Sequence, residues 1–188
     1  MDLLDAHGRA MDVFDRAVHK VGAGDWHSPT PCRDWDVRTL VNHLVGEQLW
    51  VPDLLSGRTV EEVGDAYDGD VLGDDPVGAW TSAAQAARAA WLEPHTLDRD
   101  VHLSFGDSEG EDYCWQMTVD LAVHGWDLAT ALGMDAGLGD DLVSTLLGYV
   151  GPRAKAWQGS GLFGDPVPVP ADADPQTRLL AMLGRRPR

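Results

Sequence analysis

Asp120 and His124 stand four residues apart in a stretch, 117–132, that is mostly apolar. Side chains four positions apart on a helix lie on adjacent turns of one face. A carboxylate and an imidazole on an apolar face need a partner, because burying either group unpaired costs free energy. A divalent metal ion would satisfy both groups, so this pair indicates a metal site.

The spacing alone is weak evidence, because a chain with 31 acidic residues and 7 histidines contains several such pairs by chance. A second histidine in an apolar setting strengthens it: His43 falls beside Leu40 and Leu44. The alternative for His43 is a core histidine hydrogen-bonded to a neighbouring side chain. Two histidines and one carboxylate would leave a fourth position open, which is typical of catalytic zinc sites. Zinc is therefore favoured, while nickel, iron or manganese accept the same ligand types.

Other residues near these positions could take part in chemistry. Glu47, one helical turn after His43, and Asp127 are candidate general bases. Asp127 either orients His124 as a ligand or simply forms a hydrogen bond within its helix, and the first role is preferred. Of the 8 tryptophans, Trp50 and Trp115 are candidates for lining a pocket that binds a cofactor or substrate.

The elements that would position these residues are helices. Apolar residues recur with helical periodicity in the segments 3–21, 37–55, 77–91, 111–132 and 140–157. Asp36, Asp75 and Asp174 are suitable N-caps, and Pro76 and Pro175 suit the first helical turn. We expect an all-α fold: a four-helix bundle with additional C-terminal helices and at most a short strand or hairpin.

The remaining segments are predicted as follows. Residues 58–75 form a surface connection, 101–105 a short strand, and 106–110 a turn. Helix 37–55 bends near Pro52, and helix 140–157 is kinked or broken at Gly151 and Pro152. Residues 160–170 form a non-helical crossing segment, and 176–183 a short helix that docks on the bundle.

Composition narrows the class of protein. A length of 188 residues suits a single domain over 1–188. A net charge of −17 disfavours nucleic acid and anionic membranes as partners. No stretch predicts a membrane span or a signal peptide, and the two cysteines, Cys32 and Cys114, form no metal-binding or redox motif. We expect a cytoplasmic monomer or homodimer that binds a small molecule and whose cysteines are buried and inert.

Two blocks carry a resemblance to a known family. The residues around His43 read TPCRDWDVRTLVNH (30–43), and those around His124 read DLAVHGWDLA (120–129). Both blocks resemble the DinB/YfiT-like metalloenzymes. The tail PVPVPADADPQTRLL (166–180) is similar to an actinobacterial metal-binding branch related to mycothiol-dependent maleylpyruvate isomerase.

The resemblance implies a DinB-like four-helix bundle that holds a divalent metal. In the isomerase, the metal ligands are a histidine of the second helix and an acid–histidine pair of the fourth, which correspond to His43, Asp120 and His124 here. Asp120 stands where the isomerase has Glu, so this site must be tighter or must include a water. The isomerase also has a larger C-terminal domain, so its substrate is not carried over.

The leading hypothesis is a thiol-dependent metalloenzyme. A low-molecular-weight thiol of the mycothiol type would bind the open metal position as thiolate and attack a small electrophilic substrate, giving transfer or isomerisation. The alternative is a metal-binding protein without turnover, such as a sensor or a sequestering module. An accessible pocket lined by Trp50 or Trp115 would favour the enzyme.

Overall fold

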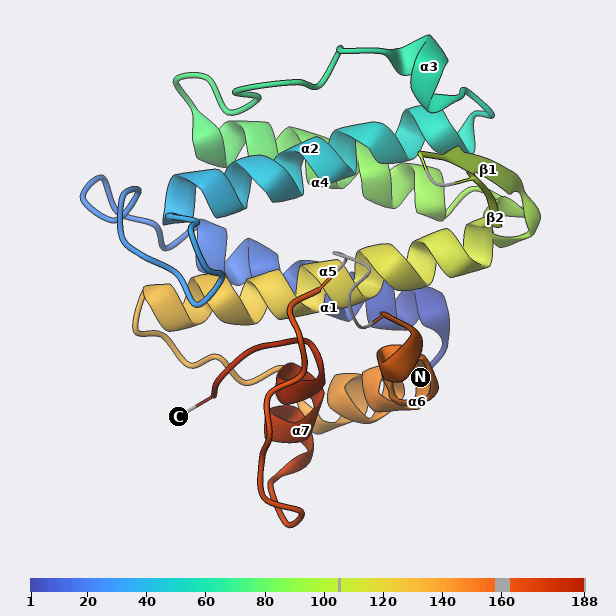
Figure 1. Cartoon of the computed structure of the whole chain (residues 1–188). Helices are drawn as coiled ribbons and strands as arrows, with labels where there is room; N and C mark the ends of the chain where they lie inside the picture. The colour runs from blue at the N-terminus through green and yellow to red at the C-terminus, as the bar shows by residue number, and fades with distance from the viewer. Residues whose placement is uncertain (105, 158–162, 188) are drawn as a thin grey trace.

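The computed structural model of the protein describes residues 1–104, 106–157 and 163–187. Four long helices form the bundle: α1 (Leu3–Val18), α2 (Val37–Leu55), α4 (Pro76–Trp91) and α5 (Gly110–Ala131). In Figure 1, α2 and α4 form one layer, α1 and α5 a second, and the C-terminal helices lie beyond α5. The predicted all-α class with a short hairpin is confirmed.

The helices begin where the capping residues predict. The side chain of Asp36 accepts a hydrogen bond from the Thr39 backbone N–H at 2.8 Å. Asp75 and Asp174 cap α4 and α7 (Pro175–Met182) in the same way. Each cap satisfies a backbone donor that the first helical turn leaves unpaired. The first helix is shorter than predicted and ends at Val18, where His19 forms the C-cap.

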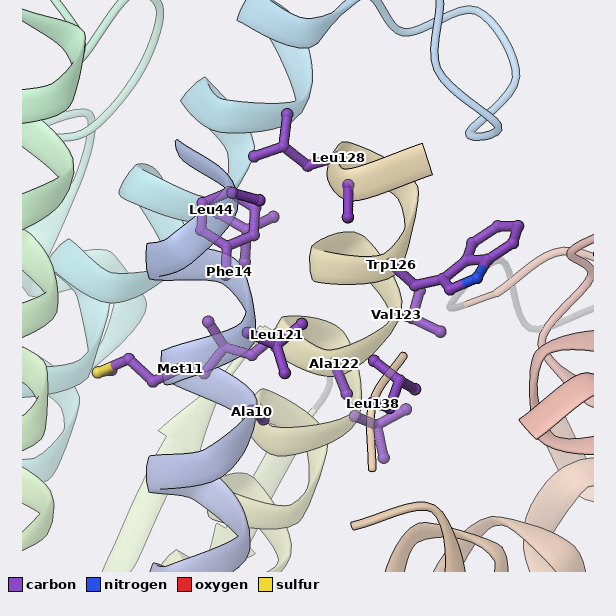
Figure 2. Packing of buried hydrophobic residues seen from close by; sticks show 14 of the residues in the cluster. Ala10, Met11, Phe14, Leu44, Leu121, Ala122, Val123, Trp126, Leu128 and Leu138 are labelled. Atoms are coloured by element: carbon purple, nitrogen blue, oxygen red, sulfur yellow. The ribbon is translucent and has the colours of Figure 1, made fainter. Parts of the chain in front are cut away.

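The two helices of the second layer approach each other closely at Gly125. A Cβ atom at Gly125 would lie 2.8 Å from Val13 Cγ1 and 3.2 Å from the Phe14 backbone nitrogen, both on α1. Figure 2 shows Phe14 of α1 and Leu121 of α5 among the buried side chains between these helices. This packing fixes the helix that carries Asp120 and His124.

Two connecting segments contain more structure than predicted. Residues 106–110 were expected as a turn, but Gly106–Glu109 form strand β2, which pairs antiparallel with β1 (Asp100–Leu103). The polar residues of β2 do not have the apolar alternation that predicts a strand. Among the described residues, β2 pairs with β1 alone, and none of its residues is buried. The predicted connection 58–75 contains a short helix, α3 (Val60–Val63), which Thr59 opens with a capping box. Phe105 lies outside the described residues.

Of the kink or break predicted at Gly151 and Pro152, the break is wrong. Helix α6 (Asp140–Trp157) runs through Pro152. Proline removes the bond to the carbonyl of Gly148, and Gly148 is exposed, so water can satisfy that carbonyl. Helix α2 likewise continues through Pro52 to Leu55.

The C-terminal helix docks on the bundle, as predicted. Leu179, Leu180 and Leu183 are buried in the main core, and α7 packs against α6. Residues 163–170 are non-helical as expected, whereas 158–162 lie outside the described part of the chain. Among the described helices, none has the length and apolar character that a membrane span requires.

Candidate metal centre

Helices α2 and α5 bring the three predicted ligands together. Nε2 of His43 lies 3.3 Å from Oδ2 of Asp120, and Nε2 of His124 lies 3.4 Å from Oδ1 of the same carboxylate. One ligand atom from each of the three residues lies within 4.8 Å of the others. The i, i+4 spacing on α5 and the facing position on α2 thus produce the cluster that the sequence indicates.

The atoms of this cluster are close enough to share one ion. Bonds of about 2.0–2.1 Å in a tetrahedron separate neighbouring ligand atoms by about 3.3–3.5 Å. The Nε2 atoms of His43 and His124 lie at 3.3 and 3.4 Å from Asp120, each from a different oxygen of its carboxylate. In addition, Oδ2 of Asp120 is buried and accepts no hydrogen bond from any residue that the structure describes, although a buried carboxylate oxygen normally has a partner. The donor set and the unpaired oxygen both suit a divalent cation.

Without an ion, the charges in this cluster stabilise one another. Burial acts to lower the pKa of His124, but the Asp120 carboxylate and then Asp127 outweigh it and raise that pKa to about 9. Burial acts to raise the pKa of Asp120, and His124 and His43 instead pull it well below its usual range. A metal ion that binds here must therefore displace a proton from His124.

Asp127 contacts the other nitrogen of His124. Its Oδ2 lies 3.0 Å from His124 Nδ1. An imidazole that donates Nδ1–H to a carboxylate keeps its Nε2 lone pair free for a metal. The same carboxylate is paired with Arg185, at 2.7 Å from Nη2. We did not predict Arg185 from the sequence; the available signal was that Asp127, within an apolar helix, requires a cation.

A loop before α2 covers the histidines. The ring of Trp35 lies 4.9 Å from that of His43 and 5.4 Å from that of His124, centroid to centroid. The Thr30 hydroxyl donates to the Trp35 backbone carbonyl at 2.9 Å and holds the loop in place. Neither Trp35 nor its role was predicted.

Cys32 of the same loop was expected to be buried and inert. Cys114 is buried, but Cys32 is only half-buried and lines the cavity at the site. Its sulfur lies within 4.8 Å of ligand atoms of His124 and Asp127. Burial raises the pKa of Cys32, so the side chain is held as a thiol.

The three candidate ligands open onto a cavity of about 1070 Å³. Trp50 lines it, as predicted, together with Glu47. Helix α6 contributes Tyr149 and Arg153. Trp115 stacks on Tyr149 with ring centroids 4.6 Å apart, so it supports a residue that lines the cavity.

Glu47 lies beside His43 at the cavity. It lines the cavity, and its Oε1 lies 3.9 Å from Nδ1 of His43. Burial, followed by repulsion from Asp120, raises the pKa of the Glu47 carboxyl. A carboxyl group with a raised pKa at a cavity is a candidate for proton transfer.

Comparisons with known proteins identify the fold and the family. The chain is 32% identical, over 193 residues, to two proteins of Mycobacterium tuberculosis from different strains, both described as uncharacterised; the alignments cover 100% of this chain and of each relative. A crystal structure of the mycothiol-dependent maleylpyruvate isomerase has a similar fold, with a TM-score of 0.64 and 15% identity. That alignment covers 86% of this chain and 73% of the isomerase chain.

A family model described as the mycothiol maleylpyruvate isomerase N-terminal domain matches residues 7–129. This range contains all three candidate metal ligands, as well as Glu47 and Asp127. The resemblance noted in the sequence, and the DinB-like helical fold that it implies, are thereby confirmed. The chain belongs to the mycothiol maleylpyruvate isomerase N-terminal domain family.

Proposed function

We propose that the protein is a divalent-metal-dependent enzyme that uses a low-molecular-weight thiol of the mycothiol type to transfer or isomerise a small electrophilic substrate. One observation carries the proposal: His43, Asp120 and His124 place ligand atoms within 4.8 Å of one another in the lining of a cavity of about 1070 Å³. Mycothiol appears in the name of the family and in that of the similar isomerase.

The three residues would hold the ion and leave a position open to the cavity. A zinc ion in such a site lowers the pKa of a coordinated thiol, so that the thiol is present as thiolate at neutral pH. Asp127 keeps His124 oriented through Nδ1, and Trp35 shields both histidines from water. The chain therefore supplies both the ligands and the groups that fix them.

Glu47 would accept and return the thiol proton in this reaction. The thiol loses its proton, and its sulfur forms a bond to the electrophilic carbon. In an addition to a double bond, Glu47 accepts the thiol proton and delivers it to the neighbouring carbon. In an isomerisation, the carbon–sulfur bond breaks again after rotation about the new single bond, and the proton returns to the thiol. Atoms and electrons balance without an oxidant or reductant.

The cavity is large enough for a small-molecule site. Ligand pockets usually have volumes of about 300–1,000 Å³. The cavity here, at about 1070 Å³, lies at the upper end of that range. Trp50 and Tyr149 offer flat apolar surfaces, while Arg153 and Ser108 offer hydrogen-bond donors. An accessible cavity lined by Trp50 supports turnover over simple metal storage.

The test combines metal analysis with an assay of turnover. Protein purified without added metal is analysed for its elements and then incubated with mycothiol and a panel of small electrophiles, including maleylpyruvate. We expect a bound divalent metal and thiol-dependent conversion of at least one electrophile, both lost in His43→Ala. His95→Ala is the matched control, because His95 is exposed and is not among the residues that line the cavity. Stoichiometric metal with no thiol-dependent turnover would contradict the enzyme and favour the metal-binding module without turnover.

A further inference from the structure

Arg185 lies in the segment after α7, beyond residues 7–129 that the family model matches. Arg185 is nevertheless only 7% exposed. Nη2 donates to Asp127 Oδ2 at 2.7 Å, and Nε donates to the same oxygen at 3.2 Å. Nη1 donates to the Leu183 carbonyl at 2.9 Å. The guanidinium is thus tied both to α5 and to its own segment.

Asp127 is fully buried, and its Oδ2 serves two partners. This oxygen accepts from Arg185 and also lies 3.0 Å from Nδ1 of His124. A buried carboxylate is retained only when a cation or several donors pair with it. Arg185 therefore provides a buried cation that pairs with Asp127 and holds its carboxylate beside His124.

The backbone holds Arg185 at this point. Gly184 has a φ of 81°, in the left-handed region, and a Cβ there would lie 2.6 Å from the Cα of Gly164. Glycine is required at such a close approach. The Arg185 backbone N–H donates to the Leu180 carbonyl at 2.9 Å. The turn after α7 thus packs closely against the 163–170 segment. This packing places Arg185 against Asp127 of α5.

We propose that Arg185 is a positioning residue of the metal centre, acting through Asp127 on His124. Arg185 fixes the Asp127 carboxylate, Asp127 fixes the imidazole of His124, and Nε2 is left facing Asp120 and the ion. The C-terminal segment is then part of the site and more than a cover for the core. This inference rests on the proposed function, because it takes His124 as a metal ligand.

Groups that orient a ligand histidine typically change metal affinity by about 10- to 100-fold when removed. We expect Arg185→Ala to weaken zinc binding by about that factor, and Arg185→Lys to recover part of the loss, since lysine keeps the charge and lacks the planar fork. The matched control is Arg186→Ala, which removes the same charge from the exposed neighbouring residue and leaves zinc affinity unchanged.

The mechanism is separated from a general structural role by a double-mutant cycle on the full chain, with zinc affinity as the readout. Asp127→Asn alone weakens binding, and adding Arg185→Ala to it has little further effect if Arg185 acts only through Asp127. The absorption spectrum of the cobalt-loaded protein should change in Arg185→Ala and not in Arg186→Ala. Circular dichroism verifies folding. If Arg185→Ala does not fold, Arg185→Met takes its place in the single and in the double variant of the cycle.

The outcomes are distinct. Parent protein that binds no zinc overturns the proposed function and, with it, the positioning role. Parent protein that binds zinc while a folded Arg185→Ala binds equally tightly overturns only the present inference. Losses that add independently in the cycle also overturn it, because Arg185 would then act by another route.

Discussion

Nε2 of His43 lies 3.3 Å from Oδ2 of Asp120, across the boundary between α2 and α5. This contact lacks hydrogen-bond geometry, and the buried oxygen has no other hydrogen-bond partner within residues 1–104, 106–157 and 163–187. The two atoms are therefore as close as neighbouring ligands of one ion, but no hydrogen bond joins them. The proposed metal site requires these two atoms to bind the same ion.

The first prediction concerns pH and stability. The pKa of His124 is raised from 6.5 to about 9 in the metal-free protein. A raised pKa means that the stabilisation is complete below pH 6.5 and disappears as the pH rises through about 9. We expect the Tm of the apo protein to fall over this interval, and His124→Gln to abolish that dependence. Thermal unfolding measured across this range tests it; an apo Tm that rises instead would disagree.

A second prediction concerns the proton carrier. Glu47→Gln keeps the shape of the side chain and removes its ability to accept a proton. Zinc affinity should stay close to that of the parent, while thiol-dependent turnover falls by about 10²–10⁴-fold. Glu61→Gln, at an exposed position of α3, is the control. Equal turnover in Glu47→Gln and the parent would remove Glu47 from the reaction.

The third prediction tests the packing that holds α5. Gly125→Ala places a methyl group 2.8 Å from Val13 Cγ1 and 3.2 Å from the backbone of Phe14, so overpacking should destabilise the fold by about 1–3 kcal/mol. Gly148→Ala, in α6 with open space around it, should be neutral or stabilise by up to about 1 kcal/mol. Urea unfolding of both variants measures the difference. Similar stabilities for the two variants would show that the α1–α5 contact is looser than described.

Local signals in the sequence predicted most of the fold. Asp36, Asp75 and Asp174 each cap a helix within three residues, so a short window contains the whole interaction. Strand β2 escaped prediction because its residues are polar and its only support comes from pairing with β1. The unbroken course of helix α6 through Pro152 was not predicted, because the exposure of Gly148 depends on the tertiary structure.

The site also contains residues that local patterns predict and residues that they do not. Asp120 and His124 are related by helical spacing, and the apolar neighbours of His43 indicate it as a third ligand. The contact between Arg185 and Asp127 joins residues 58 positions apart, so no local pattern reveals it. Trp35 and Cys32 reach the histidines through a loop whose path depends on the Thr30 hydroxyl and the Pro29–Asp36 bridge.

The most direct test of the metal centre is calorimetric titration of the apo protein with zinc and with nickel. The parent should bind one ion per chain and release protons on binding, and His43→Ala and His124→Ala should each lose far more affinity than the about 10- to 100-fold expected for Asp127→Asn. His95→Ala should bind like the parent, because that side chain is exposed. If His43→Ala and His124→Ala bind as tightly as the parent, the metal site lies elsewhere and the proposed chemistry has no support.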